Sequence, residues 1–549
     1  MEFLSLLKER YANEFQLNSN VVVKPTKYKG GGLGVFYKHT TDLLALETIE
    51  LMRIKRKFVI NLPEFQEHGQ HFPLFSTAMN ELMSDPTFDF VSKYASEKNI
   101  LMFCLTIFLS QVKDPDSDAF LIEDTERVDL KLAKEYADFV QKYISLVLME
   151  TSISTPLLYS KENLKWYKTL YPFLAVALEQ QQSFLQELHV FFESKLHINV
   201  ALSDLYQLYS AIGSRSLQIP EEISSVTQDF QVSETLVPVL DFVNHDNFKK
   251  NAYFDIDRST NDIVLFLDVP AVADKLASFE EFEVYISYDP EEHLNKFDFT
   301  YGFVPPFSLI ANSESQYLDI AIDFDLFPAE YRNISKWFQA SPLLKFKLLP
   351  NKEVQVIDDE EEGKVGSLTI FTILSGAEDY KFVLNSDCPF QLEQLANENN
   401  TPNPAMFAQS VMDAMETTES EDYENTEIIA PQLRYFFQYK ETPKINLSNL
   451  HEIASRLGVT KHSKVEWIDS YLKPYCVERC KFLKSRLDIP LVSAEYYFLK
   501  RVITNFNSDN LRTSQDKKLT ENQFLDLLST LQEQNTPKSL FLAWYERFL

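Results

Sequence analysis

The sequence predicts an α+β protein, in which a β-rich unit is divided by a helical insert and followed by a mostly α-helical C-terminal domain. Strand-like apolar segments stand near the N-terminus and return between Thr235 and Val304. From about Phe88 to Glu222 the apolar residues repeat every three or four positions, which is the period of a helix. After about Leu309 the pattern is again mostly helical. We therefore expect a β-rich unit, its insert and a C-terminal domain with the boundaries 1–90 and 230–308, 91–229, and 309–549.

Length and charge narrow the class of protein. A chain of 549 residues is too long for one compact core, so several domains are expected. The formal net charge of −29, from 52 Lys and Arg against 81 Asp and Glu, disfavours binding to nucleic acid or to an anionic membrane. It suits a basic protein partner, although an acidic surface that only keeps the protein soluble explains the same excess.

The N-terminus and the cysteines bear on location. Met1-Glu2-Phe3-Leu4 lacks the basic character of a targeting signal, and the longest apolar run, Ile100 to Leu109, is about half of a membrane span. Four cysteines in so long a chain indicate a reducing compartment. Cys476 and Cys480 could face one another on a helix, but no nearby His completes a zinc site, so we expect no metal. The cytoplasm is the expected location, with the nucleus as a second one.

A glycine cluster, Gly30-Gly31-Gly32-Leu33-Gly34, joins the first two strand-like segments, Val21 to Val23 and Val35 to Tyr37. Glycine in such a place permits a positive φ or a close approach to a ligand. No Gly-Lys-Ser/Thr follows, so the cluster is a poor phosphate loop. A tight hairpin and a loop that approaches a ligand both remain open.

Two helices of the insert are clearly marked. Ala175 to Phe192 repeats apolar residues at three- and four-residue spacing, as an amphipathic helix does. Leu202 to Ile212 has the same pattern and runs into Ser214-Arg215. On the pattern alone, Arg215 is a helix-end cation that stabilises the last carbonyl groups.

Polar groups gather at the ends of the later strand-like segments, which are Leu236–Leu240, Ala252–Asp255, Ile263–Leu267 and Glu283–Ser287. Asp241-Phe242-Val243-Asn244-His245 follows the first of them, and the last runs into Tyr288. A further strand-like piece, Phe299 to Val304, contains Tyr301. If these segments converge, they form a pocket of amide, imidazole and phenol groups. Otherwise the tyrosines are strand aromatics that pack a core.

The C-terminal region has helical signals and acidic interruptions. Ser448 to Leu457 ends at Gly458, a plausible C-cap, and Thr520-x-x-Gln523 is typical of a capping box. Polar or acidic stretches, which we expect to be solvated loops, are Asp358–Glu362, Asn397–Pro404 and Glu416–Glu427.

Taken in order, four motifs resemble those of SET-domain methyltransferases: Gly32-Leu33-Gly34-Val35-Phe36, Val237 to His245, Val284 to Asp289, and Phe299 to Val304. Within that family the resemblance is to the branch of the Rubisco large-subunit and fungal ribosomal-protein lysine methyltransferases. Three features of the insert fit the same branch, namely Thr155 to Ser160, Lys168-Thr169 and Ile212-Gly213-Ser214-Arg215. The resemblance covers about residues 20 to 306 and implies a split SET fold.

The resemblance also implies a cofactor and residue roles. The cofactor is S-adenosylmethionine, and Asn244 and His245 are expected to hold its methionine and adenine parts. Gly32, Leu33 and Gly34 are expected to lie along it, and Arg215 to contact its carboxylate. Tyr288 matches the catalytic tyrosine, which also borders the cofactor, and Tyr301 the second tyrosine of the pocket. Asp241 is expected to brace the loop around Asn244.

Three positions depart from the family pattern. The asparagine that usually follows the catalytic tyrosine comes one place late, at Asn295, which puts its substrate contact in doubt. The usual Asn-His-Ser is Asn-His-Asp, with Asp246. The strand before the insert lacks a Trp-Pro-Tyr stretch, although Tyr143 can stand for its tyrosine.

Methyl transfer from a sulfonium to an amine needs positioning and a neutral amine, and no metal. A site of Tyr, Asn and backbone carbonyl groups suits it, because a phenol is rigid and both accepts and donates hydrogen bonds. We predict a monomeric protein-lysine N-methyltransferase that acts on a basic protein, with a ribosomal protein first and an elongation factor or cytochrome c next. The alternatives are a SET-like binding module with little catalysis and a protein-histidine methyltransferase.

Overall fold

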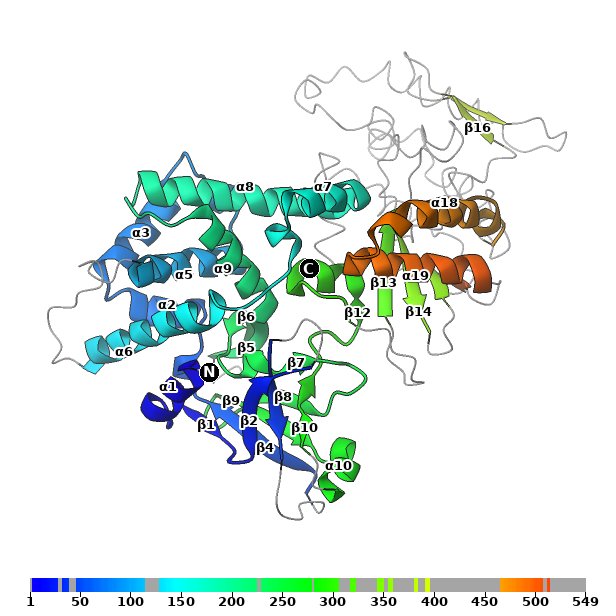
Figure 1. Ribbon diagram of the computed structural model, residues 1–549. Coiled ribbons are helices and arrows are strands. Elements are labelled where there is room, and N and C mark those ends of the chain that lie inside the picture. Colours follow the sequence, from blue (N-terminus) through cyan, green and yellow to red (C-terminus); the bar gives the residue numbers. More distant parts are fainter. Residues whose placement is uncertain are drawn as a thin grey trace, which may run out of the picture. The chain divides into compact units, whose positions relative to one another are not determined.

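The computed structural model describes most of the first 305 residues and separate segments after them (Figure 1). The described residues are 2–27, 32–38, 46–113, 128–224, 229–278, 281–305, 316–321, 343–349, 354–358, 380–383, 391–394, 465–506 and 511–513.

The chain folds into two compact units. The amino-terminal unit contains Met1–Leu170, Leu178–Pro290 and Phe297–Pro305. The carboxy-terminal unit contains Pro306–Leu549 and also two short pieces from earlier in the chain, Tyr171–Ala177 and Glu291–Lys296. The second of these pieces lies between Tyr288 and Tyr301 in the sequence.

Strands from before and after the helical insert pair with one another in the amino-terminal unit. An antiparallel sheet has the order β1 (Phe15–Leu17), β4 (Thr48–Ile54), β9 (Asp262–Asp268) and β8 (Ala252–Asp257). A second has the order β10 (Phe282–Glu283), β3 (Leu33–Tyr37) and β2 (Val21–Pro25). The predicted pairing of Val21–Val23 with Val35–Tyr37 as a hairpin is thus confirmed, and the insert does divide a β-rich unit.

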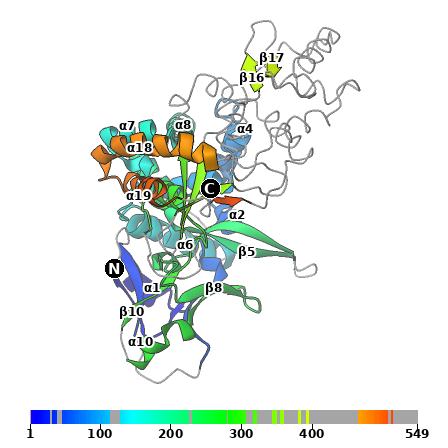
Figure 2. The same ribbon diagram turned by 90° about the vertical axis from the view of Figure 1, so that its right-hand side faces the viewer.

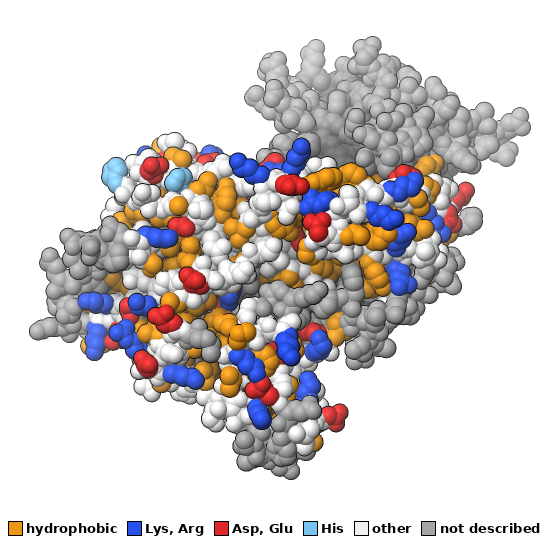
Figure 3. Space-filling model, in the orientation of Figure 1, with side chains coloured by type: hydrophobic (Ala, Val, Ile, Leu, Met, Phe, Trp, Pro, Cys, Tyr) orange, Lys and Arg blue, Asp and Glu red, His pale blue; other side chains and the backbone are white. Residues whose placement is uncertain are grey.

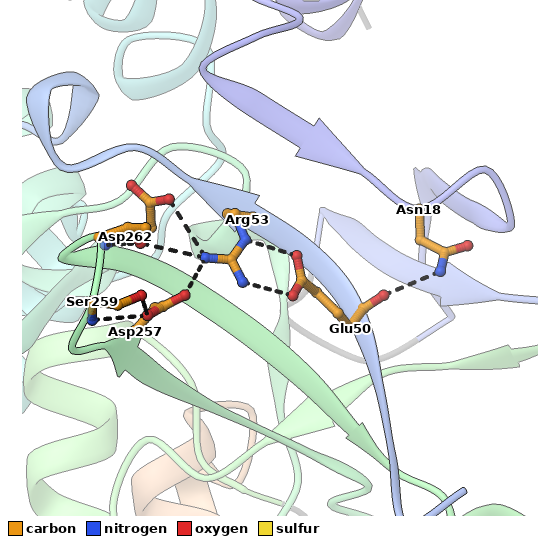
Figure 4. A network of polar contacts seen from close by, with 7 residues as sticks. Asn18, Glu50, Arg53, Asp257, Ser259 and Asp262 are labelled. Carbon is orange, nitrogen blue, oxygen red and sulfur yellow. Dashed lines mark hydrogen bonds and ion pairs between the residues drawn. The ribbon is translucent and has the colours of Figure 1, made fainter.

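Arg53 on β4 fixes the register of the first sheet (Figure 4). Its guanidinium donates to Glu50 at 2.8 and 2.9 Å, to Asp257 at 2.7 Å and to Asp262 at 3.5 Å. Asp257 ends β8 and Asp262 begins β9. Because a slip of one residue would turn every side chain to the opposite face, this cross-strand cluster opposes slippage.

Most helices of the amino-terminal unit gather on one side of its sheets, whereas the short helices α1 and α10 lie beside the strands (Figure 1). α5 carries nine consecutive buried residues, Leu101 to Leu109, and forms the centre of this helical layer. None of the described helices is long and apolar enough to cross a membrane. The helices of this unit are α1 (Glu2–Arg10), α2 (Leu62–Gly69), α3 (Pro73–Ser84), α4 (Phe90–Lys93), α5 (Glu97–Lys113), α6 (Val128–Tyr143), α7 (Lys161–Leu170), α8 (Pro172–Ser194, which begins in the other unit), α9 (Leu202–Arg215) and α10 (Ala273–Ala277).

The two helices that the periodicity marks most clearly are confirmed as α8 and α9. The end of the predicted helical stretch is not helical, because β5 begins at Ser216 and pairs with β6. β5 (Ser216–Ser224) and β6 (Asp229–Leu236) form a two-stranded ribbon (Figure 2).

The predicted strand Leu236–Leu240 is wrong. β6 ends at Leu236, and the chain turns through Val239, whose φ is 77°, into a 3₁₀ turn at Leu240–Phe242. The reason is Pro238, which lacks the N–H group that a continuing ladder needs. The apolar side chains that resemble a strand are buried in this turn instead.

The described residues of the carboxy-terminal unit contain a sheet that the sequence did not predict, besides helices. Its described residues form a five-stranded sheet in the order β12 (Glu292–His293), β13 (Gln316–Ala321), β14 (Leu343–Leu348), β15 (Val354–Asp358) and β18 (Leu511–Thr513). Leu344, Phe346 and Leu348 are buried and alternate with less buried lysines, which is the period of a strand. A separate pair is formed by β16 (Tyr380–Val383) and β17 (Gln391–Gln394).

Helices also belong to this unit. α18 (Lys473–Leu483) and α19 (Pro490–Asn505) lie side by side (Figure 1), and Arg479 donates to Glu495 across them at 2.8 Å. Cys476 and Cys480 are buried in α18. The predicted helix at Ser448–Leu457, the capping box at Thr520–Gln523 and the acidic stretches after Asp358 lie outside the described residues.

Asn295, in the short helix α11 (Leu294–Lys296), holds the edge of the five-stranded sheet. Its side chain donates to the Asp319 carbonyl at 3.0 Å and accepts from the Asp319 N–H at 2.8 Å. Asn295 is 2% exposed, so both bonds are shielded from water. The amide whose substrate contact the sequence put in doubt is therefore engaged by the main chain of β13.

We expect Asn295→Ala to destabilise the carboxy-terminal unit by about 2 kcal/mol, because it leaves a buried N–H and a buried C=O without partners. The measurement is the midpoint of urea unfolding. Lys481→Ala is the control, since Lys481 and its partner Glu478 are 67% and 58% exposed, and its effect should stay below about 0.5 kcal/mol. Equal midpoints for wild type and Asn295→Ala would refute the role given to this amide.

Candidate functional site

A short parallel strand pair brings the predicted polar segments together. β7 (Asn244–His245) pairs with β11 (Tyr285–Ile286) in the register Asn244 to Tyr285 and His245 to Ile286. The loop after Leu240 and the strand before Tyr288 therefore lie side by side, as the sequence predicts. Asp246 follows β7 and caps the next turn by accepting the N–H groups of Phe248 and Lys249, each at 3.0 Å. The departure at this position thus has a structural use.

His245 links the two segments through its ring. Its Nδ1 accepts the N–H of Tyr288 at 3.0 Å, and the ring is only 1% exposed. In the neutral ring the proton therefore lies on Nε2, because the acceptor nitrogen cannot carry it. The ring also packs on Tyr288 and Phe297, with centroids 5.2 and 4.6 Å away. In this structure His245 is a brace for Tyr288.

Tyr288 and Tyr301 form the centre of an aromatic cluster. Their ring centroids are 5.1 Å apart, and Phe297 lies 5.1 Å from Tyr301. The Tyr288 hydroxyl donates to the Val243 carbonyl at 2.8 Å. The strand predicted at Phe299–Val304 is wrong, since Tyr301 ends a π-helical turn, Phe297–Tyr301. Phe299, Tyr301 and Phe303 alternate in the sequence, and this two-residue period imitates a strand.

Both phenols are held in the neutral form. Burial raises the pKa of Tyr288, with Arg215 opposing the shift and the Asp241 and Glu283 carboxylates adding to it. Burial also raises the pKa of Tyr301, with smaller contributions from Tyr288, Asp289 and Glu234. Neither group is a phenolate base at neutral pH. They act as hydrogen-bonding walls instead.

Arg215, the last residue of α9, forms a buried ion pair with Asp241. Its Nη1 donates to Asp241 Oδ2 at 2.7 Å and to the Asp241 carbonyl at 3.1 Å, and Nη2 donates to Thr151 at 2.8 Å. Tyr143 donates to the same carboxylate at 2.8 Å. Burial lowers the pKa of Arg215, but Asp241, together with Tyr143 and Tyr288, more than offsets this effect, so the pKa is raised. Asp241 braces the loop by this pair.

The glycine segment lies against Asn244. The Leu33 carbonyl accepts from Asn244 Nδ2 at 3.1 Å. A Cβ on Gly34 would lie 2.3 Å from Glu283 Oε1 and 3.1 Å from Asn244 Nδ2, so a larger residue there would push the Glu283 carboxylate away. A Cβ on Gly32 would have no described atom within 4 Å, so that position needs no such space. Gly30 and Gly31 lie outside the described residues.

Two residues at this site were missed from the sequence. Glu283 accepts from Asn244, and Asn251 binds both Glu283 O and Tyr285 N, each at 3.0 Å. A carboxylate and an amide within strand segments resemble ordinary edge residues. Only the pairing of β10 with β3 and of β11 with β7 brings them to Asn244.

Comparison with known proteins decides the family. The family model described as cytochrome c lysine N-methyltransferase 1 matches residues 12–476. The chain belongs to this family. The protein of that name from Saccharomyces cerevisiae is 29% identical over 474 residues, which cover 80% of this chain and 73% of the relative.

Two further relatives carry the same name. The one from Kluyveromyces lactis is 33% identical over 295 residues, with 50% of this chain and 52% of the relative covered. The one from Eremothecium gossypii is 34% identical over 227 residues, with 39% and 44% covered. The match to these two thus spans about half of each relative or less. As a member of the family, the chain is a protein-lysine methyltransferase, and S-adenosylmethionine is its methyl donor.

The residues present fit this methyl donor, which carries a carboxylate, an amino group and an adenine. Arg215 Nε is buried and has no hydrogen-bond partner among the described residues, so one donor remains for an anionic oxygen. Asn244 uses both amide hydrogens within the protein, and its Oδ1 accepts no hydrogen bond from a described residue. Donor and acceptor groups of the required kinds are thus left available.

The π-helical turn of Tyr301 packs on the insert. Gly302 has φ of 74°, and a Cβ there would lie 2.7 Å from the Ser154 carbonyl carbon and 2.8 Å from the Thr155 nitrogen. Asp298, in the same turn, is 0% exposed. Burial raises its pKa to about 7, and the nearby hydroxyls of Tyr167 and Tyr159 offset part of the effect. The insert feature from Thr155 to Ser160 thus supports the turn that carries Tyr301.

Gly302→Ala should destabilise the amino-terminal unit by about 2 kcal/mol or more, because the substitution meets both an unfavourable φ and main-chain atoms. The measurement is thermal unfolding by circular dichroism. Gly32→Ala is the matched control and should leave the unfolding temperature nearly unchanged, since its new methyl group meets open space. Similar effects for the two variants would show that the close packing at Gly302 is not decisive.

Asp298 should make stability depend on pH. Its pKa is about 7 in the folded protein against 3.8 for an ordinary Asp. A raised carboxyl pKa means that the folded state holds more protons than the unfolded state between these two values. The contribution of Asp298 to the free energy of unfolding is therefore complete below about pH 4 and is lost as the pH rises through about 7. Asp298→Asn should remove this loss, on the order of 2–4 kcal/mol between pH 5 and 8. Urea unfolding at several pH values tests this, and an unchanged pH slope in the variant would contradict it.

Proposed function

We propose that this chain methylates a lysine of cytochrome c, and that its amino-terminal unit is a SET-type fold split by the helical insert. The observation that carries the proposal is the convergence of Tyr288, Tyr301 and His245 in a chain whose relatives are named cytochrome c lysine methyltransferases. The names of these relatives favour cytochrome c over the ribosomal protein that the sequence motifs suggested first.

We assign the cofactor side of the site to the segments around Asn244. Bound S-adenosylmethionine supplies an electrophilic methyl group on a positively charged sulfur. Arg215 Nε would meet its carboxylate, and the main chain from Gly32 to Gly34 would line it. Asn244 offers Oδ1 to an N–H group. His245, which the family resemblance places at the cofactor, orients Tyr288 through its ring nitrogen and borders the cofactor by its main chain in this proposal. Tyr288 borders both the donor and the acceptor.

The acceptor side is assigned to the two tyrosines. The Tyr288 hydrogen is engaged by the Val243 carbonyl, so its oxygen presents lone pairs to an N–H of the substrate amine. This contact would aim the nitrogen lone pair along the line of methyl transfer. Enclosure between the Tyr288 and Tyr301 rings removes the amine from water, which lowers its pKa and favours the neutral nucleophile. A dedicated base is then unnecessary.

Charge supports a basic substrate. The chain carries a net charge of −29, and cytochrome c is a basic protein. The described residues on the face shown in Figure 3 mix Lys and Arg with Asp and Glu. Glu234 and Asp289 act on the pKa of Tyr301, so two carboxylates lie near the tyrosine pair. They would attract an arriving lysine ammonium group.

Purified protein, labelled S-adenosylmethionine and cytochrome c should yield labelled cytochrome c, with the methyl group on a lysine by mass spectrometry. Tyr288→Phe should reduce turnover by about 100-fold, because the amine loses its orienting contact. Cofactor affinity should change less than about threefold, since the ring remains. Tyr253→Phe is the control, as its ring is 46% exposed and packs on Phe266.

Three results would overturn parts of the proposal. Labelling of ribosomal proteins but not of cytochrome c would restore the earlier substrate prediction. Methylhistidine in the product would change the acceptor residue. Binding of cytochrome c without any methyl transfer would favour a binding module.

A further inference from the structure

Glu283, at the end of β10, is the acceptor at the centre of a hydrogen-bond cluster beside Asn244. Its Oε1 accepts from Asn244 Nδ2 at 2.7 Å. Its Oε2 accepts from the Thr26 hydroxyl at 2.6 Å and from the Tyr285 hydroxyl at 2.9 Å. The three donors come from the region of β2, from β7 and from β11, so one carboxylate joins three separate parts of the chain.

This cluster determines which way the Asn244 amide points. The two atoms that face its end group are the Leu33 carbonyl oxygen and Glu283 Oε1, and both can only accept hydrogen bonds. The NH₂ group must therefore face them, and both of its hydrogens are used. Oδ1 is left as a pure acceptor on the other side. A reversed amide would place an oxygen against two oxygens, which is unfavourable.

The surroundings leave Glu283 little freedom to move. The backbone of Gly34 lies so close that a Cβ there would come within 2.3 Å of Oε1. Asn251 Nδ2 holds the Glu283 carbonyl at 3.0 Å, which fixes the main chain beneath the side chain. Burial, and next Glu283 itself, raise the pKa of Tyr285, so that this hydroxyl stays a donor.

We propose that Glu283 is a positioning residue for the methyl donor, acting through Asn244. It fixes the amide so that Oδ1 accepts a hydrogen bond from an N–H group of the donor. This inference rests on the proposed placing of the cofactor at Asn244. Two parts of the donor carry suitable N–H groups, namely the adenine amine and the α-ammonium of the methionine part.

Calorimetric binding of S-adenosylhomocysteine tests the proposal without any turnover. Glu283→Ala should weaken binding by about tenfold, because the amide is no longer held. Asn244→Ala should weaken it to a similar extent, and the double variant should be no more than about twofold weaker than Asn244→Ala alone. Independent, multiplying effects would overturn the proposal.

Glu283→Gln separates positioning from charge. Its side-chain oxygen can still accept from Asn244, while its NH₂ group can donate to the Thr26 and Tyr285 hydroxyl oxygens. It should therefore restore binding to within about threefold of wild type. Glu281→Ala is the matched control, since Glu281 lies two residues earlier and pairs with Lys24 at the surface. Failure of Glu283→Gln to restore binding would show that the charge, and not the orientation, matters.

S-inosylhomocysteine, which has a carbonyl in place of the adenine amine, distinguishes the two N–H groups. If Asn244 meets the adenine amine, S-inosylhomocysteine should bind wild type weakly. Its affinity for Glu283→Ala should then be the same as for wild type. If Asn244 meets the α-ammonium, both compounds should lose the same factor in Glu283→Ala. Wild type that binds neither compound would sink the proposed function. Wild type that binds while Glu283→Ala binds equally well would sink this inference alone.

Discussion

The hydrogen bond from the Tyr288 N–H to His245 Nδ1 is the contact on which the site depends. It extends a strand pair of only two residues on each side, β7 and β11, which by itself would be weak. A ring that is 1% exposed and packed on Phe297 makes the acceptor rigid. The position of Tyr288 is thus set from Val243 and His245, and the same segment carries Asn244. The residues that we propose for the methyl donor and for the acceptor lysine therefore share one support.

The buried pair of Arg215 and Asp241 is the second constraint, and its desolvation is unfavourable. Both side chains leave water, with 13% and 0% exposure, so the attraction between them must offset a large desolvation cost. Tyr143 and Thr151 supply the extra hydrogen bonds that such a pair requires. Loss of either charge would cost about 3–5 kcal/mol, because the other would remain buried alone. The pair joins the end of α9 to the loop before Asn244, so the insert and the β-rich unit are held at this point.

Periodicity predicted the parts of the fold that long apolar patterns control, and failed where one or two residues decide. α9 was readable over its whole length, whereas Pro238 alone ended a strand pattern that otherwise continued. Ordered motifs predicted site residues that the structure brings together, yet the π-helical setting of Tyr301 was not predicted, because Phe299, Tyr301 and Phe303 alternate as the residues of a strand do. Glu283 carried no local signal at all. Its role arises only from cross-strand pairing that brings it to Asn244.

Asn295, which stands one place later than the family pattern has it, has a structural role in the carboxy-terminal unit. Residues 291–296 belong to the carboxy-terminal unit, although they lie between Tyr288 and Tyr301. β12 adds to the sheet through β13, and the Asn295 side chain binds the main chain of Asp319. Residues 291–296 are therefore ordered by this sheet within the carboxy-terminal unit. Because the amide oxygen and one amide hydrogen of Asn295 are engaged by main-chain groups of Asp319, the asparagine at this position has a structural role that does not depend on a substrate contact.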